Sequence, residues 1–255
     1  MTLSFHKQRH RHMYTNRDID PRWYTKLSSF VTLENKEIVD VGCGAGLYTA
    51  HLAEKGASIT GVDFSEPMLE TARKNAPHLR FTKGDAYELP FEDQSIDVVF
   101  ARAVTHHLDD LDPFLLEAKR ILRVGGHVVI QNRTPEDCRV QGSPGHVRGY
   151  LLELFPELQD LENKRRVPKE SLIDQLQTTG FQSCFSRTLW EIHQVYPSVA
   201  EWADSIYKRE GRSILHELSE EQLEKYVTHV KKGVTTGQTI IDQNRWTVFI
   251  GSKEN

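Results

Sequence analysis

The sequence has few cysteines, and their spacing excludes two common ways of stabilising a fold. Three occur in 255 residues, Cys43, Cys138 and Cys184, and no pair stands in CxxC spacing. An odd number of distant cysteines supports neither a disulfide framework nor a zinc cluster. The N-terminal histidines also lack the further ligands of a metal site. We therefore expect reduced thiols and no bound metal.

The chain also lacks a long hydrophobic run and an excess of one charge. No segment approaches the roughly 18 apolar residues that cross a bilayer, and the start MTLSFHKQRHRHMY has no secretory core. The formal net charge is −4, whereas nucleic-acid-binding domains carry a clear basic surface. We therefore expect a cytoplasmic protein without membrane insertion or a nucleic-acid partner, which acts on a small molecule as a monomer or a homodimer.

What the chain does contain is typical of an α/β protein with a real core. Apolar residues make up 38% and charged residues 27%, and the length suits one domain over residues 1–255. Short apolar runs alternate with helical stretches, which predicts a doubly wound, Rossmann-like, mostly parallel sheet with helices on both faces. The seven expected strands are residues 37–42, 58–63, 79–85, 95–102, 127–133, 181–196 and 245–252.

Other segments are additions to this layout. An N-terminal arm, residues 1–33, carries a predicted helix, Arg22–Phe30, and precedes the core at residues 34–133. Residues 134–166 and 197–237 do not belong to a minimal doubly wound sheet, and the second reads as two charged amphipathic helices. We interpret both as inserts that cover the substrate.

A glycine-rich turn, Val39–Gly46, joins the first strand of the sheet to a predicted helix, Leu47–Lys55. Glycines permit a tight turn and let a ligand approach the backbone near a helix N-terminus, although packing alone also produces such turns. Asp63 ends the next strand, where its carboxylate can accept hydrogen bonds from both hydroxyls of a ribose. This pattern predicts a nucleoside site. A dinucleotide fingerprint requires glycine where Leu47 stands, and a P-loop requires a Gly-Lys-Ser/Thr ending, so both are disfavoured.

Four motifs, in this order, resemble those of class I S-adenosylmethionine-dependent methyltransferases: VDVGCGAG, GVDFSEPML, GDAYELPFEDQSIDVVFA and LRVGGHVVI. The likeness covers roughly Glu37–Gln131 and is closest to the methyltransferase type 11 subgroup with the ubiquinone/menaquinone C-methyltransferases. It implies S-adenosylmethionine as the cofactor and S-adenosylhomocysteine as its product. It does not reach the flanking segments, so it leaves the acceptor open.

The resemblance also implies contacts with each part of the cofactor. Asp40, Gly42 and Gly44 would surround the methionine part, with Asp40 acting on the amino group, and Asp63 would hold the ribose. The remaining cofactor residues that it implies are Cys43 and Gly46 in the turn, Phe64 and Met68 on the adenine, Asp85 and Ala86 at its N6 and N1, and Ala101 and Arg102 under the sulfonium. Core packing is the alternative for the two adenine residues, and a turn cap is the alternative for Asp85.

Methyl transfer from a sulfonium is an in-line displacement, which requires alignment of the acceptor more than a fixed catalytic residue. If a base exists, His106 is the first candidate because it follows the fourth strand, and His107 is the second. The alternative is that neither histidine transfers a proton during the reaction. Tyr14 and Arg17 are expected in a lid over the cofactor, and Arg133 is expected at the acceptor pocket, although exposed arginines often only solvate a surface.

The sequence therefore predicts methyl transfer to oxygen, nitrogen or carbon of a small molecule. Two other functions stay open. One is a catalytically silent protein that binds S-adenosylmethionine or S-adenosylhomocysteine, whose motifs would look identical. The other is a tRNA or rRNA methyltransferase, which only the basic N-terminal segment HKQRHRH supports.

Overall fold

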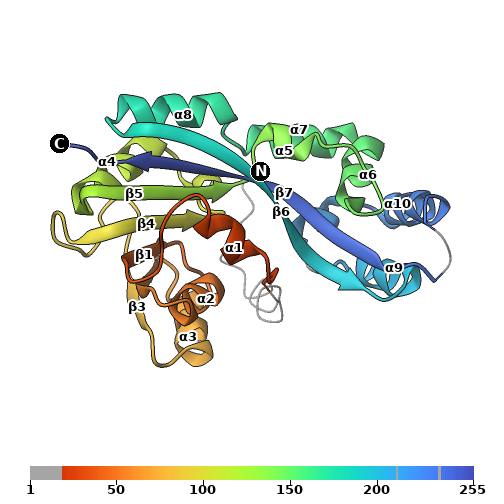
Figure 1. Ribbon diagram of the computed structural model, residues 1–255. Coiled ribbons are helices and arrows are strands. Elements are labelled where there is room, and N and C mark those ends of the chain that lie inside the picture. The colour runs from red at the N-terminus through yellow and green to blue at the C-terminus, as the bar shows by residue number, and fades with distance from the viewer. Residues whose placement is uncertain (1–18, 211, 235–236) are drawn as a thin grey trace. The chain divides into compact units, whose positions relative to one another are not determined.

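A computed structural model describes residues 19–210, 212–234 and 237–255 of the chain (Figure 1). Tyr14, Arg17 and the N-terminal histidines lie outside the described residues. Within the described part, seven strands form one sheet in the order β3-β2-β1-β4-β5-β7-β6. The strands are β1 Glu37–Val41, β2 Ser58–Asp63, β3 Arg80–Lys83, β4 Ile96–Arg102, β5 Leu122–Asn132, β6 Gln182–Tyr196 and β7 Ile240–Ser252. The predicted seven-stranded doubly wound fold is confirmed.

The sheet is parallel from β3 to β5, and β7 then joins β5 in the antiparallel direction. Residues such as Val39, Val99 and Ile130 point to one face, where they pack with α4 and α8 in the main hydrophobic core. The opposite face carries α1, α2 and α3. The helices flanking the sheet are α1 Trp23–Ser28, α2 Leu47–Glu54, α3 Glu66–Asn75, α4 Leu111–Ile121 and α8 Lys169–Thr178 (Figure 1).

Three element boundaries differ from the sequence-based expectation. The sequence predicts a helix around Pro113–Arg123, whereas helix α4 begins at Leu111. The Asp110 side chain caps it by accepting the N–H of Asp112, and proline is tolerated in a first turn. Strand β5 begins at Leu122 rather than residue 127. Strand β7 begins at Ile240 rather than residue 245, because polar residues at its buried positions conceal the apolar alternation.

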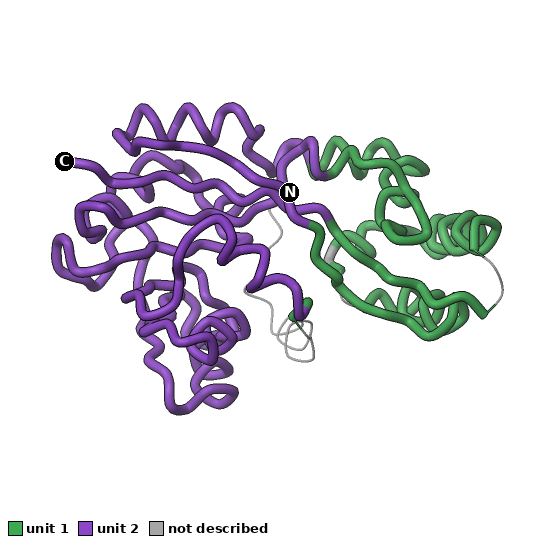
Figure 2. The backbone as a smooth tube through the Cα atoms, in the orientation of Figure 1, with its two compact units in different colours: residues 1–20, 138–162, 190–244 green, residues 21–137, 163–189, 245–255 purple. Residues whose placement is uncertain are grey.

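The described chain divides into two compact units (Figure 2). The sheet unit consists of residues 21–137, 163–189 and 245–255. The insert unit includes residues 138–162 and 190–244, which overlap the inserts predicted at 134–166 and 197–237. The prediction of a single domain, with the inserts as substrate covers, stays a prediction.

The insert unit has its own hydrophobic core, in which Trp202, Leu223 and Tyr226 are buried. A capping box at Ser219 and Gln222 begins its longest helix, α10. Helix α10 spans Glu220–Lys232, and the unit also holds α6 Val147–Leu154, most of α7 Pro156–Lys164, and α9 Val199–Tyr207. The short helix α5, Pro135–Cys138, ends where the sheet unit gives way to the insert unit. The predicted amphipathic helices therefore pack their apolar faces within this unit.

Among residues 19–210, 212–234 and 237–255, no helix combines the length and the apolar character needed to cross a bilayer. In the same part of the chain, no three histidine, cysteine or carboxylate side chains are grouped so as to hold a metal ion.

Candidate cofactor site

Strand register brings the predicted charged residues together on one face of the sheet. Asp40 in β1 pairs with Phe100 in β4 and with Gly61 in β2, and paired residues of neighbouring parallel strands point to the same face. Asp63 and Arg102 each lie two residues further along their strands, so they share that face at its carboxyl end. This is the edge at which doubly wound folds bind cofactors.

Two glycines of the turn are required by the packing of the chain itself. A Cβ at Gly42 would overlap Cγ2 of Val104, and a Cβ at Gly46 would lie 2.8 Å from Cζ of Phe81. Both have positive φ angles, +71° and +78°. Packing of the chain therefore requires glycine at positions 42 and 46, independently of any contact with a ligand.

Gly44 differs, because a Cβ there would meet only Cε of Met68, at 3.4 Å. Its N–H donates to Oδ2 of Asp63 over 2.9 Å, and the N–H of Ser65 donates to Oδ1 over 2.8 Å. The backbone of Phe64 also donates a hydrogen bond to this carboxylate. Burial raises the pKa of Asp63, and the backbone hydrogen bonds oppose that rise. The two bonds hold the carboxylate against the turn.

Asp40 is fully buried, and Thr49 of α2 donates its hydroxyl to Oδ2 over 2.6 Å. Burial raises the pKa of Asp40 to about 7, the charge of Asp63 adds to the rise, and the Thr49 bond and Arg102 oppose it. A cationic group beside Asp40 would favour its ionised form. In the same turn, burial and the two carboxylates raise the pKa of the Cys43 thiol, which therefore stays protonated.

The structure separates the two residues expected on the adenine. Phe64 is 60% exposed, so its ring does not pack in the core, and its contact with the adenine stays a prediction. Met68 is half-buried beside Gly44. At the end of β3, Oδ1 of Asp85 accepts the N–H of Tyr87 over 3.0 Å, so the predicted turn cap is present. Ala86 packs partly against the main core.

Ala101 and Arg102 point to opposite faces at the end of β4. Ala101 is buried in the main core, so its side chain is turned away from the face that carries Asp40. The guanidinium of Arg102 lies 3.9 Å from the ring centroid of Tyr48 and 4.3 Å from that of Trp246. Arg102 therefore lies close to two aromatic rings, and its place under the sulfonium stays a prediction.

His106 and His107 lie in a 3-10 turn, Thr105–His107, beyond the end of β4, with ring centroids 4.0 Å apart. Desolvation lowers the pKa of His107, and the nearby charges of Arg165 and Arg166 lower it further. A neutral imidazole is the form that can accept a proton. The turn thus stands at the expected edge, and the role of either histidine as a base stays a prediction.

Arg133, expected at the acceptor pocket, is only 2% exposed. It donates to the backbone carbonyl of Asp137 over 3.2 Å, while the Asp137 carboxylate accepts from Arg245 and Thr247 of β7. This network fixes the chain after β5. Arg133 therefore has a structural contact, and its place at the acceptor pocket stays a prediction.

Sequence reasoning missed three residues that shape the site. Thr49 holds Asp40, and the rings of Tyr48 and Trp246 lie against the guanidinium of Arg102. The signal available for Thr49 is its helical spacing from the buried Leu52, which places a polar side chain on the inward side of α2. For Trp246 there was no signal, because nearly 150 residues separate it from Arg102.

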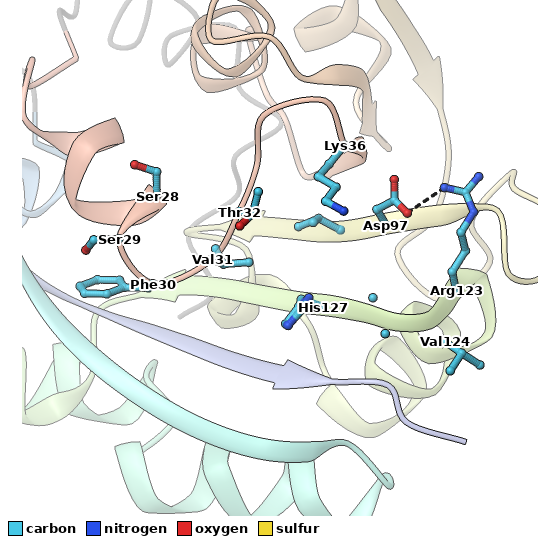
Figure 3. A pocket seen from close by; sticks show the side chains of 13 residues that line it. Ser28, Ser29, Phe30, Val31, Thr32, Lys36, Asp97, Arg123, Val124 and His127 are labelled. Carbon is cyan, nitrogen blue, oxygen red and sulfur yellow. Dashed lines mark hydrogen bonds and ion pairs between the residues drawn. The ribbon is translucent and has the colours of Figure 1, made fainter.

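Two hollows of the sheet unit lie apart from these residues. One, of about 480 Å³, lies at the amino ends of the strands, where Lys36, His127 and the ion pair of Asp97 with Arg123 line it (Figure 3). The other, of about 550 Å³, adjoins Thr105 and the first turn of α8. Because cofactors of doubly wound folds bind at the carboxyl ends of the strands, the hollow in Figure 3 is not the cofactor site.

Comparison with known proteins links this geometry to one family. A family model for the methyltransferase domain matches residues 39–130. The phthiotriol/phenolphthiotriol dimycocerosates methyltransferase 1 of Mycobacterium ulcerans is 35% identical over 118 residues, which cover 45% of this chain and 44% of that protein. The demethylmenaquinone methyltransferase of Tropheryma whipplei is 36% identical over 100 residues, with coverages of 37% and 41%. The chain thus spans less than half the length of these curated relatives.

A solved structure extends the likeness in fold beyond the cofactor core. The SAM-dependent methyltransferase from Aquifex aeolicus matches with a TM-score of 0.53 at 16% identity, covering 91% of this chain and 94% of that one. At this identity the likeness concerns the fold. Residues 39–130, which carry the glycine turn and both site carboxylates, match the methyltransferase domain model, and over this region the chain is similar to S-adenosylmethionine-dependent methyltransferases of class I.

Proposed function

We propose that this chain transfers the methyl group of S-adenosylmethionine to oxygen, nitrogen or carbon of a small-molecule acceptor. The observation that carries the proposal is the pair of buried carboxylates, Asp40 and Asp63, beside a glycine turn at the carboxyl edge of the sheet. One carboxylate suits an amino group and the other suits two ribose hydroxyls, and a nucleoside joined to an amino acid carries both.

The residues of the site divide the work of binding. Asp63 accepts hydrogen bonds from the ribose, and its bonds to Gly44 and Ser65 already fix its orientation. Asp40 meets the amino group. The exposed ring of Phe64 offers a face to the adenine, and Asp85 with the backbone N–H of Ala86 supplies an acceptor and a donor for its edge.

The sulfonium supplies a methyl group that is already activated for displacement. The protein therefore has to align the acceptor with that methyl group and exclude water, and alignment of two bound reactants is worth on the order of 7–11 kcal/mol. His106 and His107 stand at the correct edge to accept a proton if the acceptor must lose one. A base of this kind would add about 10²–10⁴-fold.

Two observations support a small molecule as the acceptor: the net charge of the chain and the names of its curated relatives. The chain has a net charge of −4, which gives no general attraction to RNA. The names of two relatives contain demethylmenaquinone and phthiotriol or phenolphthiotriol dimycocerosates, which are small molecules rather than nucleic acids. Both observations support a small-molecule acceptor over tRNA or rRNA.

The test combines binding with product detection. Purified protein is incubated with methyl-labelled S-adenosylmethionine and a cell metabolite extract, and labelled products are sought by mass spectrometry. We expect a labelled small molecule, together with S-adenosylhomocysteine binding that Asp63→Asn weakens by roughly tenfold or more. Asp93→Asn is the matched control, because this exposed carboxylate pairs with Arg120 at the surface.

Three results would argue against the proposal. Binding of S-adenosylhomocysteine without any labelled product would favour a silent binding protein. Binding of NADH but not S-adenosylhomocysteine would favour an oxidoreductase. Salt-dependent RNA affinity that is lost with the first twelve residues would favour an RNA methyltransferase.

A further inference from the structure

The hollow of about 480 Å³ at the amino ends of the strands has one wall that is a bulge of β5 (Figure 3). Between two consecutive pairs of the β4–β5 ladder, four residues of β5, 123–126, stand opposite the single residue Asp97. The segment after β7 fixes this bulge. The N–H of Gly125 donates to the carbonyl of Lys253 over 2.7 Å, and the N–H of Lys253 donates to the carbonyl of Gly126 over 2.9 Å. Bulges are common beside ligand sites, because they take a segment out of the ladder.

The opposite wall is the end of α1 with the turn that follows it, residues 28–32. Trp23 of this helix is buried, and its indole N–H donates to the side chain of Gln131 over 2.8 Å. His127 lies four residues before Gln131 in β5, so its side chain points to the same face of the sheet. Both walls are therefore held in place by contacts within the sheet unit.

The carboxylate in this hollow, that of Asp97, is already paired. Its Oδ2 accepts the N–H of Glu37 over 2.8 Å, and its Oδ1 accepts from Nη1 of Arg123 over 2.9 Å. Burial would raise the pKa of Asp97, but these hydrogen bonds and the charges of Arg123 and Lys36 lower it below its usual value. The charge of Asp97 is thus matched by Arg123, which leaves Lys36 as an additional positive charge.

Lys36 is a half-buried cation whose ammonium has neither a hydrogen bond nor an ion pair among residues 19–210, 212–234 and 237–255. It faces the same space as Asp97 and His127 (Figure 3). Desolvation lowers the pKa of His127, and the charge of Lys36 lowers it further. Asp97 takes one of the five N–H donors of Arg123, and the other four have no hydrogen-bond partner in the described part of the chain. The hollow therefore has more donors than acceptors for them.

An apolar surface adjoins these cations. Phe30, Val31 and Val124 line the same hollow, and Val124 is 50% exposed. A ligand that covers Val124 would remove this surface from water. The volume also falls within the range of small-molecule sites, which is roughly 300–1,000 Å³. The hollow thus suits a molecule with an anionic group at one end and an apolar group at the other.

We propose that this hollow binds a small phosphate monoester whose organic part is apolar. Lys36, Arg123 and protonated His127 donate to the phosphate oxygens, while Phe30 and Val124 contact the organic part. A phosphate suits three donors on separate segments better than a carboxylate does, because it presents three oxygens rather than two in one plane.

The phosphate site is separate from the cofactor site. Lys36 precedes Asp40 by four residues of extended chain, which is a separation of about 13 Å toward the amino edge of the sheet. A ligand in the hollow and a cofactor at the carboxyl edge can therefore bind at the same time. The inference does not rest on the proposed function, and it is tested without methyl transfer.

Titration calorimetry of the full chain with phenyl phosphate, inorganic phosphate and benzoate tests the site. We expect phenyl phosphate to bind most tightly. Inorganic phosphate should bind about threefold to tenfold more weakly because it lacks the apolar ring, and benzoate should bind at least about tenfold more weakly because it lacks the third oxygen. Saturating S-adenosylhomocysteine should leave the affinity for phenyl phosphate unchanged.

Substitutions separate the two ends of the hollow. Lys36→Met should weaken both phosphates by roughly tenfold, whereas Lys36→Arg should keep most of the affinity. Lys74→Met is the matched control, because Lys74 is an exposed lysine of α3 that does not line the hollow. Val124→Ser should reduce the preference for phenyl phosphate over inorganic phosphate to less than about twofold. Val124 is at the surface, so this variant keeps the test available should Lys36→Met fail to fold.

The pH dependence of binding gives a separate readout for His127. The charged groups that line the hollow with it are Lys36, Arg123 and Asp97. As the pH falls from 8 to 6 the imidazole gains a proton, and a bound phosphate favours that charged form. The affinity of the wild type relative to His127→Asn should therefore rise by about threefold or more over this range. The ratio cancels the ligand's own second pKa, which lies near about 6.

The inference fails if the wild type does not bind phenyl phosphate, or if Lys36→Met keeps the wild-type affinity. Equal binding of benzoate and phenyl phosphate would overturn the assignment to phosphate. Competition between S-adenosylhomocysteine and phenyl phosphate would place the probe in the cofactor site instead of the hollow.

Discussion

Asp40 is buried, and under the proposed function it carries a negative charge when a cationic amino group binds beside it. Burial raises its pKa to about 7, whereas an unfolded chain leaves an aspartate near about 3.9. Between these values the folded protein keeps a proton that the unfolded chain releases. The extra proton on Asp40 stabilises the folded protein relative to the unfolded chain. This contribution is complete below the unfolded pKa of Asp40, and it is lost as the pH rises through the folded pKa.

Asp40→Asn should therefore stabilise the protein while it weakens binding. At pH 8 the buried charge of Asp40 destabilises the wild type, and asparagine carries no such charge. We therefore expect the free energy of unfolding to increase by about 1–3 kcal/mol in Asp40→Asn. The gain should shrink toward pH 5, where the wild-type carboxyl is protonated. Urea denaturation at pH 5, 6.5 and 8 measures this.

Binding should show the opposite pH dependence. The wild-type affinity for S-adenosylhomocysteine should rise by roughly tenfold from about pH 6 to pH 8, as Asp40 ionises. In Asp40→Asn the affinity should be low and independent of pH over that range. A variant that is less stable at pH 8, or one that keeps the wild-type pH profile of binding, would contradict this account of Asp40.

At the scale of the element, the glycine turn before α2 combines a left-handed backbone with close packing. Gly46 has a φ of +78° and lies against the ring of Phe81 and the methyl of Ala72. Gly125 has nearly the same φ, +79°, but a Cβ there would meet nothing within 4 Å. The two glycines thus share the backbone requirement and differ only in their surroundings.

Gly46→Ala should destabilise the chain by about 2–4 kcal/mol, and Gly125→Ala by about 1 kcal/mol. The difference isolates the packing against Phe81, and denaturant unfolding of both variants measures it. Only Gly46→Ala should also reduce the affinity for S-adenosylhomocysteine, because the turn carries the Gly44 N–H that orients Asp63. Equal losses in the two variants would mean that backbone conformation alone matters.

On the scale of the whole molecule, the chain has two units, each with a core of its own. Leu223 of α10 is buried in the core of the insert unit, and Leu69 of α3 is buried in the sheet unit with Ala72 and Phe81. Both side chains have no exposed surface. A cavity in either core should lower stability mainly in the unit that contains it.

Leu223→Ala should accelerate amide hydrogen exchange mainly in residues 138–162 and 190–244, while S-adenosylhomocysteine affinity changes by less than about threefold. Leu69→Ala should accelerate exchange in the sheet unit and weaken binding, because α3 follows Asp63 and Phe64. Each substitution should cost about 2–4 kcal/mol. Exchange that rises equally across the chain after Leu223→Ala would show that the two units unfold as one.

Much of the site was predictable because its residues follow strand ends. Asp40, Asp63 and Arg102 stand at or near the carboxyl ends of parallel strands, and such ends meet at one edge of a doubly wound sheet. Strands β1, β2 and β4 were equally predictable, since strands covered on both faces are nearly continuous in hydrophobic residues. The start of β7 was not predictable, because the polar residues Asp242 and Asn244 occupy its buried positions.

What the amino-acid sequence determined by itself is the doubly wound fold, the glycine turn and the carboxylates of the cofactor site, because local periodicity and strand-end position encode them. The tertiary structure alone decided the neighbours of each charge. Thr49 holds Asp40, Trp246 covers Arg102, and Arg133 turns inward to the Asp137 network. These contacts join segments that lie far apart or on different elements, and a pattern of neighbouring residues carries no information about which distant side chain fills the space beside a charge.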